Sequence, residues 1–466
     1  MKNSNLPVAI IGAGPIGLAT AVHLLKSHQK FILFEAKKNV GANILTWSHV
    51  KLFSPWQYNI DKEAEKLLIK NGIKIPNKKE VPLGKQLVDA YLKPLSEIVE
   101  IKQNLHLNTE VLSIGRKGLD KMKNANRENV PFSIKVNENN HFKIYEAKAI
   151  IDASGTWQNP NPVGSGGVFA VGEKENKHHF FYGMPDVSNK LIAKYANKTV
   201  LVVGGGHSAI GTVLALSNIQ EKHPKTQIHW LLRKKNVSEV YGGQEADGFK
   251  SRGQLGIRIE KLVNSGNIEI HTPVFINEFK KHNKKLIVRG YKNGQEFVLK
   301  NIDKVISNTG TRPDFSFLRE IRFDADASIE CVTELATLID PNIHSCGTVR
   351  PHGEAELRQK EKDFYIVGMK SYGRAPTFLM ATGYEQVRSI VAYINGDFEA
   401  AKDIQLVLPE TGVCSTNIEA EICCSNATSS KEEINCCTID KPTKQVSSCC
   451  DKIETNKMNS KKTSCC

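Results

Sequence analysis

A pattern of apolar strand, glycine turn and helix occurs twice in the chain, and it restricts the fold more than any other feature. The first copy, "VAIIGAGPIGLATAVHLL", predicts a strand over residues 8–11 and a helix from about residue 15. The spaced glycines permit a tight turn, let the backbone approach a pyrophosphate, and allow the helix to pack closely on the strand. The next predicted strand, "FILFE", ends in an acid whose carboxylate suits a ribose diol. The residues that carry this prediction are Gly12, Gly14, Pro15, Gly17 and Glu35.

The second copy, "TVLVVGGGHSAIGTVLALS", begins with a strand predicted over residues 199–203. The strand predicted after it, "QIHWLL", is followed by Arg233, where the first copy has Glu35. An arginine at this place suits the additional 2′-phosphate of NADP, which an acid would repel. A plain solvated cluster of basic residues is the alternative interpretation. The two copies therefore predict sites for two different dinucleotides. The residues that carry the second site are Gly204, Gly206, Ser208, Ala209 and Arg233.

With these two motifs, the chain resembles the flavoproteins that have two dinucleotide-binding domains, a family that includes flavin-dependent monooxygenases and thioredoxin reductase. Two further segments, "IIDASGT" and "VISNTGTRP", look like the connections by which this family crosses between its domains. The resemblance implies an α/β fold with two Rossmann-like domains, FAD in the first and NADPH in the second. It places the FAD-binding domain at residues 1–190 and 305–405, and the inserted NAD(P)H-binding domain at residues 191–304.

The same resemblance implies further cofactor contacts, at Trp47, Ser154, Gly155, Gly310, Gly347 and Gly368. The segment "DPNIHSCGTV" is similar to the flavin-contacting turn near the end of such proteins, but Thr348 replaces the usual Asp. The later segment "FYIVGMKSYGRAPTFLMATG" offers Gly368 and Thr377 for the same role, or it simply closes the domain. Trp47 is predicted to flank flavin or substrate, although aromatic residues in loops also serve in packing alone.

Hydride transfer from NADPH to flavin leaves the electron acceptor open among three alternatives. A disulfide is disfavoured, because residues 1–330 contain no cysteine and Ile16 stands where similar low-molecular-weight disulfide reductases carry one. Oxygen is the second alternative. The monooxygenase motif F-x-G-x-x-x-H is matched by Phe181 and Gly183, but Val187 replaces its histidine.

The third alternative involves the C-terminal segment, residues 411–466, which contains no Phe, Trp or Tyr and is predicted to be a disordered tail. Four pairs of adjacent cysteines recur in it at intervals of thirteen, thirteen and sixteen residues. Adjacent cysteines do not easily form a relaxed disulfide with each other, whereas paired thiolates suit a soft metal or metalloid ion. The predicted ligands are Cys423, Cys424, Cys436, Cys437, Cys449, Cys450, Cys465 and Cys466.

Composition excludes several other classes of protein. The net charge of +14 comes from scattered lysines, without the clustered basic and aromatic pattern of a nucleic-acid-binding protein. No stretch reaches the roughly 18 apolar residues that a membrane span requires. Nine of the eleven cysteines lie beyond residue 410, which is not the distribution of a disulfide-stapled secreted fold. We therefore expect a cytoplasmic protein, and a homodimer is left open.

The segments "GRAPTFLMATGYEQVRS" and "LPETGVCS" resemble the flavin-binding oxidoreductases associated with bacterial arsenic resistance. The sequence thus predicts an NADPH-dependent FAD oxidoreductase that handles a thiophilic metalloid or metal through its terminal cysteines. One alternative is a flavin-dependent monooxygenase that acts on a small organic or organometalloid substrate. Another is a non-enzymatic, flavin-containing metal buffer or metallochaperone.

Overall fold

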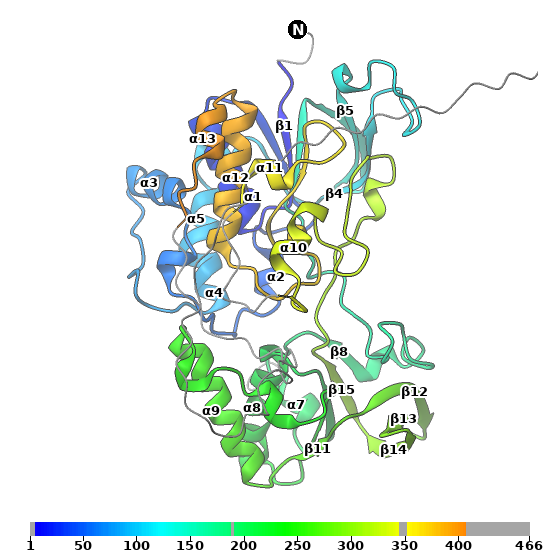
Figure 1. The fold of residues 1–466 in the computed structure, drawn as a ribbon. Helices are drawn as coiled ribbons and strands as arrows, with labels where there is room; N and C mark the ends of the chain where they lie inside the picture. The colour runs from blue at the N-terminus through cyan, green and yellow to red at the C-terminus, as the bar shows by residue number, and fades with distance from the viewer. Residues whose placement is uncertain (1–4, 188–190, 344–351, 407–466) are drawn as a thin grey trace, which may run out of the picture. The chain divides into compact units, whose positions relative to one another are not determined.

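The computed structural model describes residues 5–187, 191–343 and 352–406 (Figure 1). The predicted tail cysteines and Gly347 lie outside the described residues, so the predictions for them stay predictions. No helix within the described ranges is both long and apolar enough to cross a membrane.

A first parallel sheet of five strands, in the order β16-β7-β1-β2-β3, carries the first glycine turn. Every residue of β1, β2, β7 and β16 is buried, as expected for a parallel sheet that is covered on both faces. Helices α1 (Pro15–Lys26) and α12 (Met380–Ile394) lie side by side against it (Figure 1). The strands are β1 Val8–Ile11, β2 Phe31–Phe34, β3 Leu105–His106, β7 Ala149–Asp152 and β16 Phe364–Ile366.

A second parallel sheet of five strands, in the order β11-β10-β9-β15-β8, carries the second glycine turn. Helices α8 (His207–Lys222) and α9 (Lys250–Asn264) pack against each other beside it. The strands are β8 Phe180–Tyr182, β9 Thr199–Val203, β10 Gln227–Leu231, β11 Glu269–His271 and β15 Lys304–Ser307.

Each parallel sheet is accompanied by an antiparallel sheet of three strands. The strands β12, β13 and β14 share a hydrophobic cluster with the second parallel sheet, and β4, β5 and β6 share one with the first. Their bounds are β4 Thr109–Arg116, β5 Phe132–Glu138, β6 His141–Ala147, β12 Phe275–His282, β13 Lys285–Lys292 and β14 Gln295–Ile302.

The remaining helices are short, apart from α3, whose N-cap Asp61 accepts hydrogen bonds from two backbone amides of its first turn. Their bounds are α2 Ala42–Leu45, α3 Lys62–Lys70, α4 Gly84–Leu87, α5 Lys93–Ser96, α6 Val99–Lys102, α7 Ile192–Tyr195, α10 Ala336–Ile339, α11 Glu354–Leu357 and α13 Phe398–Lys402.

The predicted α/β class with two Rossmann-like sheets is confirmed. Strand pairing adds a detail to the predicted domain division. Strand β8 and most of β15 belong to segments that the sequence assigned to the FAD-binding part, yet both pair within the second sheet. Short strands without a helical crossover of their own give little signal in the sequence, because only their hydrogen-bonded neighbours reveal the sheet they join.

The two segments predicted to connect the sheets lie side by side. Arg312 donates its backbone N–H to the carbonyl of Asn159, and Asn161 donates its own to the carbonyl of Gly310. The hydroxyls of Thr156 and Thr311 are 2.8 Å apart. The "ASGT" and "NTGTRP" segments therefore form a hydrogen-bonded double connection.

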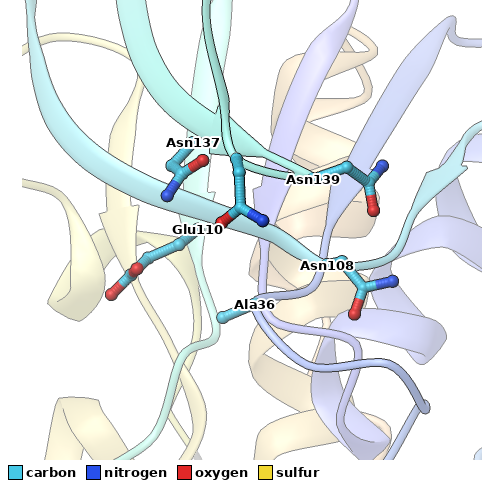
Figure 2. Close-up of a pocket in the computed structure, with 6 residues that line it drawn as sticks. Ala36, Asn108, Glu110, Asn137 and Asn139 are labelled. Atoms are coloured by element: carbon cyan, nitrogen blue, oxygen red, sulfur yellow. The ribbon is translucent and has the colours of Figure 1, made fainter.

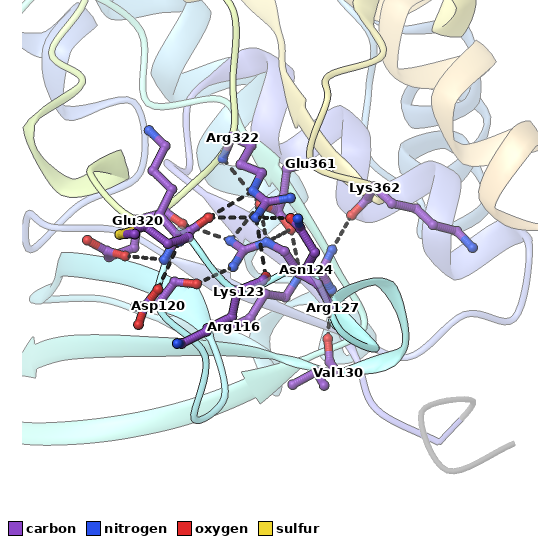
Figure 3. Close-up of polar contacts among 12 residues, drawn as sticks. Arg116, Asp120, Lys123, Asn124, Arg127, Val130, Glu320, Arg322, Glu361 and Lys362 are labelled. Carbon is purple, nitrogen blue, oxygen red and sulfur yellow. Dashed lines mark hydrogen bonds and ion pairs between the residues drawn. The ribbon is translucent and has the colours of Figure 1, made fainter. Parts of the chain in front are cut away.

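A buried cluster of ion pairs holds the antiparallel sheet β4–β6 to the segment that leads into β16 (Figure 3). The Glu361 carboxylate accepts a hydrogen bond from Arg116 Nε at 2.8 Å and one from Arg127 Nη2, also at 2.8 Å. Burial acts to raise the pKa of Glu361, but the hydrogen bonds from the two arginines prevail and hold that pKa below its ordinary value. The cluster fixes the chain three residues before β16, and so positions the turn that follows this strand.

Candidate functional site

The first glycine turn has the shape of a phosphate cradle, and each of its three positions holds glycine for a different physical reason. Gly12 has a φ of +96°, and a Cβ there would lie 2.8 Å from the carbonyl oxygen of Ala153. A Cβ on Gly17 would lie 1.8 Å from the carbonyl oxygen of Gly12. By contrast, a Cβ on Gly14 would meet no atom within 4 Å. The protein itself thus requires glycine at positions 12 and 17, while position 14 faces open space before the N-terminus of α1.

Open space at this position fits a dinucleotide pyrophosphate. The N-terminus of α1 carries unpaired backbone N–H groups and the positive end of the helix dipole, which together favour an anion. Pro15 begins the helix, where a missing N–H costs nothing. The residues predicted for this cradle therefore fit the pyrophosphate of FAD, and the assignment of each as a cofactor contact stays a prediction.

Glu35 follows β2 and is fixed beside the glycine turn. Its Oε2 accepts a hydrogen bond from the backbone N–H of Ala13, and its Oε1 accepts one from Lys37, both at 2.9 Å. The residue is only 9% exposed, and burial raises the pKa of its carboxyl, against the two backbone hydrogen bonds, which lower it. Each carboxylate oxygen retains a second lone pair for a ribose hydroxyl.

A polar hollow of about 470 Å³ begins one residue after Glu35, at Ala36 (Figure 2). Asparagines line most of it, and the side-chain oxygen of Asn137 is buried without a hydrogen-bond partner. This hollow was not predictable from the sequence, because its lining residues come from separate strands and turns. The lining residues are Ala36, Asn108, Glu110, Asn137, Asn139 and Asn140.

The turn after β7 contains Ser154 and Gly155 and is anchored by a buried ion pair. Asp152 Oδ1 accepts hydrogen bonds from the backbone N–H and the hydroxyl of Ser154, at 3.1 and 2.6 Å. The Lys370 ammonium donates to Asp152 Oδ2 at 2.7 Å and to Ser154 Oγ at 3.1 Å, and both charged side chains are fully buried. Sequence reasoning missed this pair, because nothing in the sequence distinguishes Lys370 from a surface lysine.

The turn after β16 contains Gly368, which has a φ of +68° and donates its backbone N–H to Gln386 Oε1 at 2.8 Å. A Cβ on Gly368 would lie 3.1 Å from the side chain of Ile16 in α1. The turns at Gly12, Ser154 and Gly368 thus follow three adjacent strands, β1, β7 and β16. In open α/β sheets, ligands bind beyond the carboxyl ends of the strands.

Trp47 lies in the loop after α2 and packs against protein. Its ring contacts Gly84, where a Cβ would lie 2.9 Å from it, and its centroid is 6.1 Å from that of Trp157. Trp157 donates its indole N–H to Thr46 Oγ1 at 2.7 Å. The predicted flavin contact of Trp47 stays a prediction. Next to the two tryptophans is a hollow of about 280 Å³. The hollow is lined by Thr46, Trp157, Gln158, Pro160, Phe181, Tyr182 and Met184.

The second glycine turn has the same steric features as the first. Gly204 has a φ of +134°, and a Cβ there would lie 2.3 Å from the carbonyl oxygen of Asn308. A Cβ on Gly206 would meet no atom within 4 Å, as at the corresponding position of the first turn. Ala209 is fully buried against the sheet at the third glycine position, and Ser208 lies in the first turn of α8.

Arg233 lies two residues beyond the end of β10 and is exposed, with Nη1 donating to the carbonyl of Ser165 at 3.2 Å. Glu35 directly follows β2, so Arg233 lies one residue further beyond its strand than Glu35 does, and its contact with NADPH stays a prediction. Gly310, with a φ of +85°, lies in the connection after β15 and accepts the backbone hydrogen bond from Asn161.

Among the described residues the only cysteine is Cys331, which is buried, and burial raises the pKa of its thiol to about 12. A thiol reacts as its thiolate, so this one is inert at neutral pH. The described part of the chain therefore supplies no dithiol for exchange with a disulfide. Ile16 is itself buried in α1, beside the turn at Gly368.

The family model for pyridine nucleotide-disulphide oxidoreductases matches residues 9–347, which span both cradles. The chain belongs to this family. It is therefore an oxidoreductase, and the prediction of an enzyme is confirmed. A ferredoxin–NADP reductase of Lactobacillus gasseri is 27% identical over 345 residues, which are 73% of this chain and 85% of that protein.

Solved structures show the same fold. The bacillithiol disulfide reductase Bdr of Bacillus cereus has a TM-score of 0.61 and 21% identity, covering 84% of this chain and 99% of that one. The cadaverine monooxygenase DfoA of Erwinia amylovora, solved with FAD, has a TM-score of 0.62 and 11% identity, covering 89% and 100%. The predicted likeness to disulfide reductases and flavin monooxygenases is confirmed.

Proposed function

We propose that the chain is an NADPH-dependent FAD oxidoreductase, with FAD in the first cradle and NADPH in the second. The observation that carries this proposal is the contrast between the two cradles. Both place a glycine that faces open space before the N-terminus of a helix, but a buried acid follows the first and an exposed arginine follows the second. An acid favours an unmodified ribose and an arginine favours a 2′-phosphate.

The residues around the first cradle serve to bind and orient. Glu35 accepts hydrogen bonds from a ribose, and the N-terminus of α1 donates to phosphate. The Asp152–Lys370 pair holds the Ser154 and Gly368 turns together, because Lys370, two residues after Gly368, donates its ammonium to both Asp152 and Ser154. FAD bound here supplies the two-electron chemistry, by accepting hydride from NADPH and passing electrons to an acceptor.

The acceptor that we propose is a small molecule or a thiophilic metalloid. The hollow next to Trp157 has room for a small substrate, and its lining includes polar Thr46 and Gln158 as well as apolar Phe181 and Met184. The link to arsenic or another soft ion is supported by the sequence alone, through the four C-terminal cysteine pairs and the resemblance given above.

Monooxygenase chemistry is the second candidate, and the segment after β8 is the observation that bears on it. Phe181 lines the hollow. Gly183 has a φ of +102°, and a Cβ there would lie 3.2 Å from the ring of Trp157. Val187, at the motif's histidine position, is 1% exposed and packs in the second core. The Phe and Gly of the motif therefore lie at the hollow and beside Trp157, but a buried core valine replaces the motif's histidine.

The two candidates are separated by following NADPH oxidation with and without oxygen, in the presence of trivalent and pentavalent arsenicals and of small amines. Stimulation by an acceptor that persists without oxygen supports the reductase. Oxygen uptake matched one-to-one to a hydroxylated product supports the monooxygenase. Protein that binds no flavin after reconstitution with FAD would refute both.

A further inference from the structure

The second parallel sheet carries two histidines and a glutamate that converge at its edge. His229 is in the middle of β10, while Glu269 and His271 are the first and last residues of the edge strand β11. In the parallel register, His229 is opposite Glu269, and Leu231 is opposite His271. Because side chains alternate along a strand, all of these residues project from one face of the sheet. The sheet itself therefore brings the three side chains together.

The contacts among the three side chains are short. His229 Nδ1 lies 3.0 Å from His271 Nε2 and 3.3 Å from Glu269 Oε2. Because a 3.0 Å contact between two ring nitrogens needs a lone pair on one of them, the two imidazoles cannot both be fully protonated. One ligand atom from each residue lies within 4.8 Å of the other two.

We propose that His229, Glu269 and His271 bind a divalent transition-metal ion of the zinc type. Zinc takes imidazole nitrogen and carboxylate oxygen at about 2.0–2.2 Å, so ligand atoms of a tetrahedral site lie roughly 3.3 Å apart. The contacts of 3.0 and 3.3 Å are close to that separation. Three protein ligands leave a fourth position for water, on the side where the Glu269 side chain is 65% exposed.

The surroundings favour an ordered site. The His229 side chain is only 7% exposed, and the ring of Phe297 packs edge-on against His271 with centroids 5.4 Å apart. Lys292 disfavours a bound cation, because its positive charge acts electrostatically at His271. Loss of this charge, in Lys292→Met, is therefore expected to tighten metal binding.

The test uses the full-length, FAD-reconstituted protein with its accessible thiols blocked by N-ethylmaleimide, since the terminal cysteines would otherwise bind the probe. Zinc chloride is titrated calorimetrically, and zinc retained after gel filtration is counted by mass spectrometry. We expect about one equivalent for the wild type, and binding weaker by at least about tenfold in His271→Ala and in Glu269→Gln. Because Glu269 is exposed, its substitution leaves folding intact, which protects the test from a trivial loss of structure.

Matched controls are His141→Ala and Glu296→Gln, which remove an exposed histidine of β6 and an exposed glutamate of β14. Both are expected to retain the wild-type stoichiometry and affinity. The proposal is overturned if thiol-blocked wild type binds no zinc, or if Glu269→Gln and His271→Ala bind it as tightly as the controls. Neither result bears on the proposed oxidoreductase activity, which is measured separately as flavin reduction by NADPH.

Discussion

Substitution of Gly14 by alanine separates cofactor binding from folding. The φ of Gly14 is −83°, which any residue adopts, and a Cβ there would meet no protein atom within 4 Å. We therefore expect the free energy of unfolding of the FAD-free protein to change by less than about 1 kcal/mol. The added methyl group instead occupies the space in which a pyrophosphate approaches the backbone.

The cost to FAD binding follows from the contacts that the methyl group displaces. A hydrogen bond to a charged group contributes about 1.5–3 kcal/mol. Loss of one backbone contact to phosphate therefore predicts roughly 10- to 100-fold weaker FAD binding, since about 1.4 kcal/mol corresponds to a factor of ten. The dissociation constant is measured by the quenching of flavin fluorescence when FAD-free protein is titrated.

Two further glycine variants complete this experiment. Gly17→Ala places a Cβ 1.8 Å from the Gly12 carbonyl oxygen, so it is expected to lower the melting temperature of the FAD-free protein itself. Gly206→Ala is expected to leave the affinity for FAD unchanged and to raise the KM for NADPH. An unchanged affinity for FAD in Gly14→Ala would refute the assignment of the first turn as the phosphate cradle.

Three other predictions concern Arg233, the buried ion pairs of Glu361, and the C-terminal cysteines. Arg233→Ser is expected to raise the KM for NADPH by roughly 10- to 100-fold, with the KM for NADH nearly unchanged, in steady-state assays with both nucleotides; equal effects on the two would contradict the 2′-phosphate role. Glu361→Gln leaves two buried arginines without their carboxylate, which is expected to cost about 3–5 kcal/mol in denaturant unfolding at neutral pH. Because the pKa of Glu361 is held below its ordinary 4.5, its stabilising effect is complete above that value and is lost as pH falls through the lowered pKa; wild type should lose stability there more steeply than the variant. Truncation after Glu410 is expected to abolish high-affinity binding of trivalent arsenic while flavin reduction by NADPH continues at the full-length rate, and unchanged arsenic binding would refute the role of the tail.

The sequence predicted the parts of the fold that are local. These parts are the two strand–glycine–helix units, the acid after β2 and the arginine after β10. Each lies within a short segment, so residues that are close along the chain are also close in the folded structure. Glycines at positions 12 and 204 have positive φ values, which is the backbone reason for the motif.

Features that depend on distant segments were not predictable. Lys370 is 218 residues from its partner Asp152, and Glu361 is 245 residues from Arg116. A single sequence does not show which of its many charges become buried together, because burial depends on the finished packing. The cluster of His229, Glu269 and His271 was missed for the same reason, since strand register alone places these residues side by side.

The most direct test of the account is a single-turnover reaction without oxygen, in which FAD-reconstituted protein is mixed with NADPH and flavin absorbance is followed. The account predicts rapid bleaching with NADPH, slower bleaching when the transferred hydrogen of the nicotinamide is deuterium, and much weaker saturation with NADH. Flavin that binds but is not bleached by NADPH, or bleaching without preference between the two nucleotides, would contradict the pairing of an FAD cradle with an NADPH cradle.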